Sequence, residues 1–285
     1  MIYTDLAIES ASMLNAAPDP SSSGITVHEA SPSPDVKITR ITIDTEEAAS
    51  AMHKPCGTYI TIESPDFLQE RPEITQALRE AVAAELTRLV PFHPCRKVLI
   101  AGIGNEKITP DSLGPHTISK IRVTRHLFVE YEAESDTRQT NVAAIHPGVM
   151  AQTGIETAEI LHRLVDFLKP DVLIAVDSLA ARDVSRMNTT IQITDTGIAP
   201  GAGTKNHRVH LTKETMGCQV IAIGVPTVIH CQALLNDPEA PDLIVTGTNI
   251  DQVIHDFSSV IADGLDLTLH PGLFSGCDSG HRYHL

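Results

Sequence analysis

The sequence has few basic residues for its length, and this shortage limits the partners it can have. Its 285 residues include 21 Lys and Arg against 36 Asp and Glu, which gives a formal net charge of −15. A protein that binds phosphate groups needs a basic surface, so we expect no nucleic-acid partner and no anionic membrane partner. An acidic enzyme more naturally attracts a basic substrate.

Cysteine pairs and long apolar runs are also missing. The five cysteines are odd in number and include no C-x-x-C pair, which argues against a disulfide framework and a structural zinc site. They are Cys56, Cys95, Cys218, Cys231 and Cys277. The first residues, MIYTDLAIES, lack the features of a signal peptide, and no segment approaches the roughly 18 apolar residues of a membrane-spanning helix. We therefore expect a soluble, cytoplasmic protein.

Apolar runs that are short but continuous indicate the fold class. They are VLIAGIG (98–104), VLIAVD (172–177) and VIAIGVP (220–226). Runs that are apolar at every position are typical of strands covered on both faces, as in a parallel sheet between helix layers. The sequence therefore predicts an α/β fold with three α/β/α layers, built on a mostly parallel central sheet.

The N-terminal third has a different pattern. The segment VKITRITID, which begins at Val36, alternates between apolar and polar residues, and TYITIE (58–63) does so more weakly. Both predict additional, smaller β segments. Residues 72–90 open with Pro and carry apolar residues at helical spacing, which predicts a helix. The stretch 18–35 is rich in Pro and Ser and is expected to be a loop.

The glycine-rich turn GIGNEKITPDSLGP (102–115) follows the first of the continuous apolar runs. It fails the dinucleotide pattern G-x-G-x-x-G because Lys107 stands at the third glycine position, and it contains no G-x-x-x-x-G-K-[ST] phosphate loop. Glycines that only let the strand turn tightly are an equal alternative. Beyond the turn lies Asp111, which is either a helix cap or a reactive carboxylate.

A second carboxylate, Asp177, ends the apolar run VLIAV. Doubly wound sheets bind ligands outside the carboxyl ends of their strands, although Asp177 could also cap a helix in SLAARDVSR. Two aspartates at the ends of two buried strands can converge on one crevice and share a proton. One carboxylate then acts as a base toward water, and the other acts as an acid.

Several blocks together resemble the germination protease family of spore-forming bacteria. They are ITPDSLGP (108–115), HPGVMAQTGIET (146–157), AVDSLAARDVSRMNTTIQITDTGIAPGAG (175–203), VIAIGVPTV (220–228) and NIDQVIHDFSSVIADGLDLTLHP (249–271). The resemblance implies a fold similar to that of the hydrogenase-maturation peptidases, which also begin their motif with G-x-G-N. It implies an aspartic-type endopeptidase without a cofactor, in which Asp111 and Asp177 match the family's two essential aspartates.

The same resemblance implies the biological setting. It predicts digestion of small acid-soluble spore proteins during germination, in the forespore and spore core, by a homotetramer that is made as an inactive zymogen. The segment TDLAIE, which starts at Thr4, is similar to the cleavage sequence in those substrates. We therefore expect self-cleavage between Asp5 and Leu6, which gives a propeptide (1–5) and a single peptidase domain (6–285).

The chain also departs from longer family members, and other functions stay open. Only residues 231–248 join the V-P-T-V block to the last helix, where longer members carry an insert, and residues 274–285 are expected to be a flexible tail. The alternatives are a metal-dependent hydrolase, a peptidase like those of hydrogenase maturation, and a nucleotide-binding module. No metal ligands are predicted, because the fourteen histidines include no H-E-x-x-H motif. Asn105 and Arg182 are candidates for substrate binding.

Overall fold

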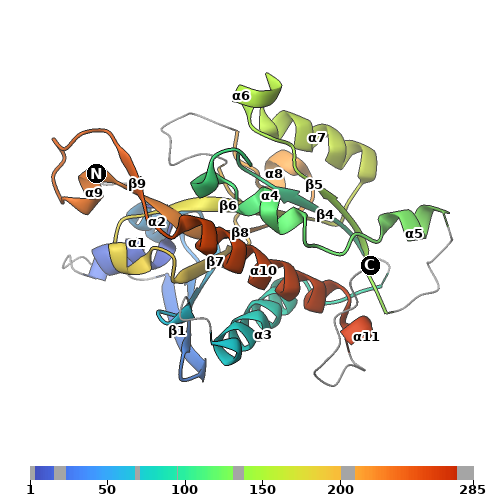
Figure 1. Cartoon of the computed structure of the whole chain (residues 1–285), viewed down its shortest axis with the longest axis horizontal. Helices are drawn as coiled ribbons and strands as arrows, with labels where there is room; N and C mark the ends of the chain where they lie inside the picture. Colours follow the sequence, from blue (N-terminus) through green and yellow to red (C-terminus); the bar gives the residue numbers. More distant parts are fainter. Residues whose placement is uncertain are drawn as a thin grey trace.

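A nine-stranded sheet forms the centre of the computed structural model, which describes residues 4–15, 24–67, 71–94, 96–130, 138–199 and 209–274 (Figure 1). The strand order is β1-β2-β3-β7-β8-β6-β4-β5, and β9 pairs with β8 outside this path. The strands are β1 (Ile25–Ser33), β2 (Val36–Ile43), β3 (Gly57–Glu63), β4 (Lys97–Gly102), β5 (Asn141–Ile145), β6 (Val172–Ala181), β7 (Thr190–Thr194), β8 (Gln219–His230) and β9 (Ile244–Thr246).

The sheet is mixed, so the expectation of a mostly parallel sheet is wrong. The strands β5, β4, β6 and β8 pair in parallel. The strands β1, β2, β3 and β7 pair antiparallel, and β7 joins the two halves by pairing antiparallel with β8. The two predicted additional strands therefore exist as β2 and β3, but they belong to the same sheet, together with β1 and β7. Alternation shows that a strand has one buried face, but it does not show which strand lies beside it.

The continuous apolar runs do form the buried strands β4, β6 and β8. In β6, Val172, Ile174 and Val176 pack on one face of the sheet, and Leu173 and Ala175 pack on the other. The strand continues to Ala181, because its pairing with β8 continues as far as Ile229. The segment SLAARDVSR is therefore not a helix: it completes β6 and then forms a short 3-10 helix, η5 (Val184–Arg186).

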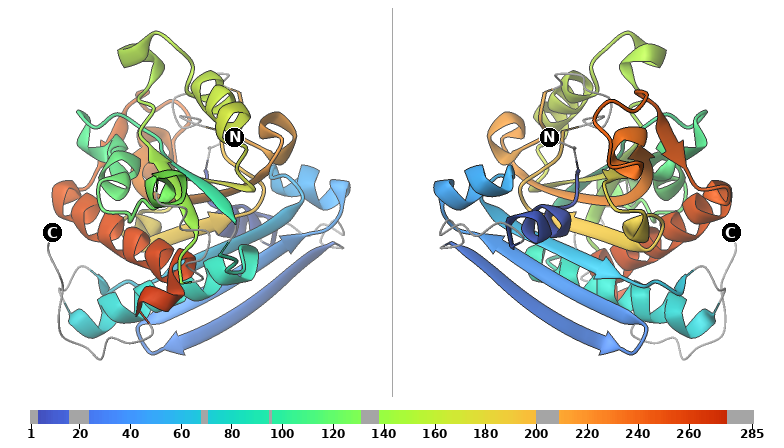
Figure 2. Two further views of the ribbon diagram at one scale, coloured as in Figure 1. Left: turned by 90° about the vertical axis from the view of Figure 1, so that its right-hand side faces the viewer. Right: turned by 90° about the vertical axis from the view of Figure 1, so that its left-hand side faces the viewer.

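Helices cover both faces of the sheet (Figure 2). One face carries α3, α4 and α10, and the other carries α1, α2, α7 and α8. The helix predicted over residues 72–90 is confirmed as α3, and α10 lies beside it. The helices are α1 (Ala7–Asn15), α2 (Glu46–Met52), α3 (Pro72–Leu89), α4 (Leu113–Ile118), α5 (Arg125–Glu130), α6 (Met150–Thr153), α7 (Thr157–Leu168), α8 (Lys213–Met216), α9 (Cys231–Leu234), α10 (Ile250–Leu269) and α11 (Pro271–Phe274).

The segment expected to be a loop, residues 18–35, contains a strand instead. Its second half forms β1, which makes an antiparallel hairpin with β2 from the pair Ile25–Ile43 to the pair Ser33–Val36. This strand is the exposed edge of the sheet, where polar residues and Pro32 are tolerated, so its composition is that of a loop. Residues 1–3 of the expected propeptide, residues 18–23 of the expected loop and residues 275–285 of the expected tail lie outside the described residues.

Candidate active site

Asp177 lies inside β6, near the centre of the sheet. Its side chain is only 4% exposed, and its Oδ1 accepts a hydrogen bond of 2.8 Å from the backbone N–H of Ser178. Because Val176 faces the cluster that contains α10, the alternating pattern of the strand turns Asp177 to the opposite face. Leu179, the next residue on that face, belongs to the same buried cluster as Leu6, at the N-terminal end of the described chain.

Asp111 lies in a short 3-10 helix, η3 (Thr109–Asp111), in the connection that follows β4. Its Oδ2 accepts a hydrogen bond of 2.8 Å from the backbone N–H of Asn105. The hydroxyl of Thr227 in β8 donates to the carbonyl of Pro110 at 2.7 Å. These contacts hold η3 against the glycine turn on one side and against β8 on the other.

Two glycines bring η3 and α4 onto the strand ends. Gly104 has a φ of +116°, and a Cβ at this position would lie 1.9 Å from the carbonyl oxygen of Asp111. A Cβ on Gly114 would lie 2.5 Å from the carbonyl oxygen of Val176, the residue before Asp177. The segment that carries Asp111 therefore lies directly on the carboxyl end of β4 and beside the position in β6 where Asp177 follows.

This geometry explains the glycine turn. In a phosphate loop the backbone N–H groups of the turn point at a bound anion. Here the N–H of Asn105 points at a carboxylate of the same chain, that of Asp111. The segment that carries Asp111 thus lies beside Val176, the residue that precedes Asp177 in β6, and the turn positions the Asp111 carboxylate.

The two candidate substrate-binding residues have structural contacts. The Oδ1 of Asn105 accepts hydrogen bonds from the Nε2 of Gln152 at 2.7 Å and from the N–H of Lys107 at 3.0 Å, so this side chain ties the turn to α6. The guanidinium of Arg182 contacts the sulfur of Met13, and its backbone N–H donates to Glu9. Arg182 is thus held against α1, and neither contact is with a group at Asp177.

The predicted cleavage site is part of a docked N-terminal segment, residues 4–9. Leu6 is fully buried and packs in one cluster with Leu179 of β6. The backbone N–H of Asp5 donates to the carbonyl of Ala180 at 3.0 Å, and the N–H of Ala180 donates to Oδ2 of Asp5 at 2.7 Å. The carboxylate of Glu9 accepts hydrogen bonds from the N–H groups of Arg182 and Asp183, at 2.9 and 2.8 Å.

Two residues that hold this segment were not found from the sequence. The Nζ of Lys54 donates to the carbonyls of Thr4 and Asp5, both at 3.0 Å. The amide of Gln192, in β7, donates to the carbonyl of Asp5 at 3.0 Å and accepts from the N–H of Ala7 at 2.8 Å. Neither residue belongs to a motif, and both are far from residues 4–9 in the sequence, so no local pattern could have indicated them.

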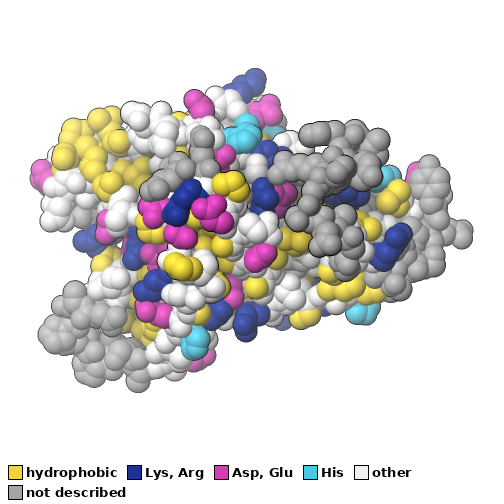
Figure 3. Space-filling model, turned by 60° about the horizontal axis from the view of Figure 1, so that its bottom comes forward, with side chains coloured by type: hydrophobic (Ala, Val, Ile, Leu, Met, Phe, Trp, Pro, Cys, Tyr) yellow, Lys and Arg dark blue, Asp and Glu magenta, His cyan; other side chains and the backbone are white. Residues whose placement is uncertain are grey.

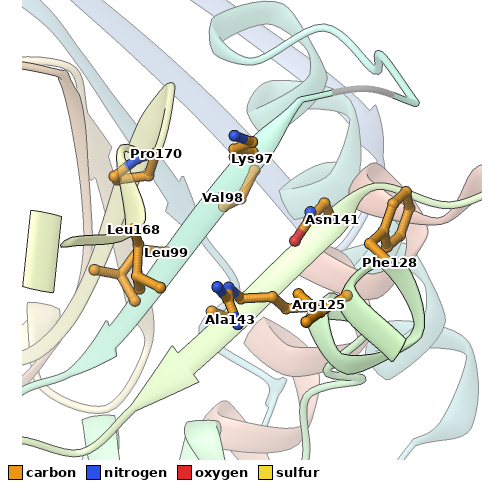
Figure 4. Close-up of a pocket in the computed structure, with 10 residues that line it drawn as sticks. Lys97, Val98, Leu99, Arg125, Phe128, Asn141, Ala143, Leu168 and Pro170 are labelled. Atoms are coloured by element: carbon orange, nitrogen blue, oxygen red, sulfur yellow. The ribbon is translucent and has the colours of Figure 1, made fainter. Parts of the chain in front are cut away.

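A surface cavity elsewhere in the molecule is separate from this site. It is lined by residues that include Lys97, Arg125 and Asn141, and Figure 4 shows it beside β4 and β5. Lys97 and Asn141 are the first residues of their strands, whereas Asp111 follows the last residue of β4. The cavity therefore lies at the opposite end of the sheet from the two aspartates.

The described part of the chain contains neither a metal-ligand cluster nor a membrane-spanning helix. No group of three or more His, Cys, Asp or Glu side chains in these residues is arranged to hold a metal ion. None of the helices described is both long enough and apolar enough to cross a lipid bilayer.

Comparison with known proteins decides the family. A family model described as germination protease matches residues 4–239, which include both aspartates and the docked segment. The chain belongs to the germination protease family. Membership makes it a protease that acts in spore germination.

Several germination proteases are similar over most of their length. One from Clostridium perfringens is 36% identical over 95% of this chain and 96% of its own length. One from Caldanaerobacter subterraneus is also 36% identical, over 95% of each chain. A Bacillus cereus germination protease is 40% identical over 83% of this chain but only 65% of its own length, so that relative has additional sequence with no counterpart in the match.

Proposed function

We propose that this germination protease is an aspartic-type endopeptidase that degrades small acid-soluble spore proteins. The observation that carries the proposal is the placement of Asp111 after the carboxyl end of β4, in a segment that packs against Val176, the residue before Asp177 in the parallel strand β6. In the proposed mechanism the two carboxyl groups share one proton, because like charges a few ångström apart do not both ionise easily. The ionised carboxylate then takes a proton from water, and the protonated one gives its proton to the leaving amine.

We further propose that the chain is made as a zymogen and activates itself by cleaving the bond between Asp5 and Leu6. Support comes from the docking of this bond: Leu6 lies in one buried cluster with Leu179, which projects from the same face of β6 as Asp177. Mild acid is expected to promote the cleavage, because a carboxylate pair needs one proton to act.

The experiment that tests the catalytic assignment uses Asp111→Asn, Asp177→Asn and the double variant. Each single variant should lose cleavage of purified spore proteins, and the double variant should be little worse, because residues that act as one unit are not additive. Asp171→Asn is the matched control, since Asp171 lies just before β6 and accepts the N–H of Lys97 at 2.8 Å. Near wild-type cleavage by a folded Asp111→Asn or Asp177→Asn protein would refute the assignment. Retention of activity in chelator would argue against the metal-dependent alternative.

We also propose that the protein acts as a homotetramer in the forespore and spore core, without binding DNA itself. Support for assembly comes from an arm formed by α9 and β9, which carries exposed apolar side chains at Leu234, Leu235, Leu243, Ile244 and Val245. In Figure 3, hydrophobic side chains gather at the left end of the molecule, the end where the arm lies in Figure 1. Contiguous exposed apolar surface is typical of interaction sites. The net charge of −15 supports the absence of DNA binding.

A further inference from the structure

The carbonyl oxygen of Asp5 accepts hydrogen bonds from two side chains that come from different parts of the fold. The Nζ of Lys54 and the Nε2 of Gln192 each lie 3.0 Å from it. The Oε1 of Gln192 accepts the N–H of Ala7 at 2.8 Å, so one amide group contacts the backbone on both sides of the bond between Asp5 and Leu6.

These contacts are withdrawn from solvent. Gln192 is 6% exposed, and Leu6 is completely buried. Burial lowers the pKa of Lys54, while the carboxylates of Asp5 and Glu9 act in the opposite direction. Donors in such surroundings interact more strongly with developing negative charge than donors in water, because the effective dielectric constant is lower.

Gln192 projects from the face of the sheet that carries Asp177. Gln192 of β7 pairs with Gly224 of β8, and Gly224 pairs with Asp177 of β6. Residues directly opposite each other in paired strands project from the same face. Ile191 and Ile193, the neighbours of Gln192, pack on the other face, as Val176 does beside Asp177. Asp177 and Gln192 therefore project from one face, in register across three strands.

We propose that Lys54 and Gln192 are catalytic residues that polarise the carbonyl group of Asp5 during self-cleavage. This inference rests on the proposed function, because it takes the bond between Asp5 and Leu6 as the bond that is cleaved. Polarisation by two donors makes the carbonyl carbon more electrophilic, and both donors then stabilise the negative oxygen of the tetrahedral intermediate.

The step balances without any further reactant. The oxygen of water forms a bond to the carbonyl carbon of Asp5, and one proton of the water passes to the ionised carboxylate of the aspartate pair. The bond from this carbon to the nitrogen of Leu6 then breaks, and that nitrogen takes the proton of the other carboxyl group. The products are a carboxylic acid at Asp5 and a free amine at Leu6, and the pair again holds one proton.

The decisive variant is Gln192→Glu, which keeps an acceptor for the N–H of Ala7 but removes the donor to the Asp5 carbonyl. The first-order rate of loss of residues 1–5, followed by intact mass, should fall on the order of 10²-fold at neutral pH. The rate should recover as the pH falls, because the introduced carboxyl group can donate again once it is protonated. Because acid also speeds the wild type, the readout is the rate of the variant divided by that of the wild type at each pH. A side chain that only holds the segment in place would leave this ratio unchanged as the pH falls.

Variants at position 54 test the second donor. Lys54→Met should slow the loss of residues 1–5 to a similar extent, and Lys54→Arg should restore part of the rate because it keeps a cationic donor. Gln76→Glu is the matched control, since Gln76 is exposed on α3 and its Nε2 donates only to Glu80 among the contacts described. Thermal unfolding shows whether each protein folds. If Lys54→Met does not fold, the two single variants Gln192→Glu and Lys54→Arg test the carbonyl-polarising role instead.

The wild-type protein separates failure of this inference from failure of the proposed function. Wild-type cleavage after Asp5 with unchanged rates in folded Gln192→Glu and Lys54→Met proteins would overturn the carbonyl-polarising pair alone. A wild-type protein that digests spore proteins but is never cleaved after Asp5 would overturn self-processing, and the inference with it. Failure of the wild type to cleave any protein would overturn the proposed function.

Discussion

Asp5 and Ala180 exchange two hydrogen bonds, one between their backbones at 3.0 Å and one from the N–H of Ala180 to the Asp5 carboxylate at 2.7 Å. The N-terminal segment thus continues the hydrogen-bonding pattern of the last part of β6. Cleavage after Asp5 would remove this contact, because Asp5 would leave with the propeptide while Leu6 would remain just before α1. Substitutions in the docked segment are therefore expected to change the stability of the protein as well as its self-cleavage.

The first prediction concerns Glu9, which anchors the docked segment. Its carboxylate accepts the N–H groups of Arg182 and Asp183, so Glu9→Ala leaves two backbone donors without this partner. The free energy of unfolding should fall by about 1–3 kcal/mol, as measured by urea denaturation. Glu80→Ala, at an exposed position of α3, should change it by less than about 0.5 kcal/mol. An equal, small change in both variants would show that the segment contributes nothing to stability.

The second prediction concerns Gly104, which lies against Asp111. In Gly104→Ala the added Cβ meets the Asp111 carbonyl oxygen, and the φ of +116° is unfavourable for alanine. Protease activity should fall by more than tenfold, and the protein should be less stable by more than about 1 kcal/mol. Gly154→Ala is the matched control, because Gly154 has a φ of +73° but no atom within 4 Å of the new Cβ. Equal effects of the two substitutions on activity would contradict a special role for the turn.

The third prediction concerns Asp266, near the C-terminal end of α10. Burial raises its pKa to about 6, although the N–H of Arg122 donates to its carboxylate at 3.1 Å. A folded-state pKa above the ordinary value of 3.8 means that stability is lost as the pH rises from about 4 through about 6. Asp266→Asn should therefore be more stable than the wild type at pH 7, by up to about 3 kcal/mol, and not at pH 4. Thermal melts at the two pH values measure the difference.

The fourth prediction concerns His270, whose pKa is shifted downward, so that its effect on stability has the opposite dependence on pH. Burial lowers its pKa to about 4, and its Nδ1 accepts the N–H of Thr140 at 3.3 Å. A lowered folded-state pKa gives stability that is present above the ordinary value of 6.5 and is lost as the pH falls through about 4. His270→Asn should flatten this acid limb of the stability profile. An unchanged slope between pH 6.5 and 4 would show that His270 does not contribute to it.

The fifth prediction concerns the exposed arm. If copies assemble through its apolar side chains, Leu243→Asp combined with Ile244→Asp should shift the particle mass to smaller species in sedimentation equilibrium. Val27→Asp is the control, because Val27 is also an exposed apolar residue but lies in the edge strand β1. A tetramer that survives the double substitution would place the interface elsewhere.

Local signals were enough to predict the central strands and α3. The runs that became β4, β6 and β8 are apolar at nearly every position, and this pattern occurs mainly where both faces are covered. The edge strand β1 could not be predicted, because it needs few apolar residues and tolerates Pro32. The end of β6 was missed for a related reason: the burial of Leu179 and Ala181 depends on α1, which is far away in sequence.

Some residues of the candidate site could be predicted from the sequence, and others could not. Asp111 and Asp177 could be selected because they follow apolar runs that end at one edge of the sheet. Lys54 and Gln192 could not, because their only signal is contact with residues 4–7, and contact between distant segments requires the fold. The roles of Asn105 and Arg182 likewise depend on Gln152 and Glu9, which the sequence does not place beside them.

The position of β7 has a consequence for how the chain folds as it is synthesised. The antiparallel pairs β1–β2 and β2–β3 are local in sequence and can form early, but the free side of β3 pairs with β7, which runs from Thr190 to Thr194. Ribosomes add about 5–20 residues per second, so β3 waits on the order of ten seconds for its partner. During that time it presents an unpaired edge with apolar side chains, the type of surface on which nascent chains aggregate. These early strands are therefore where we expect a chaperone to bind the growing chain.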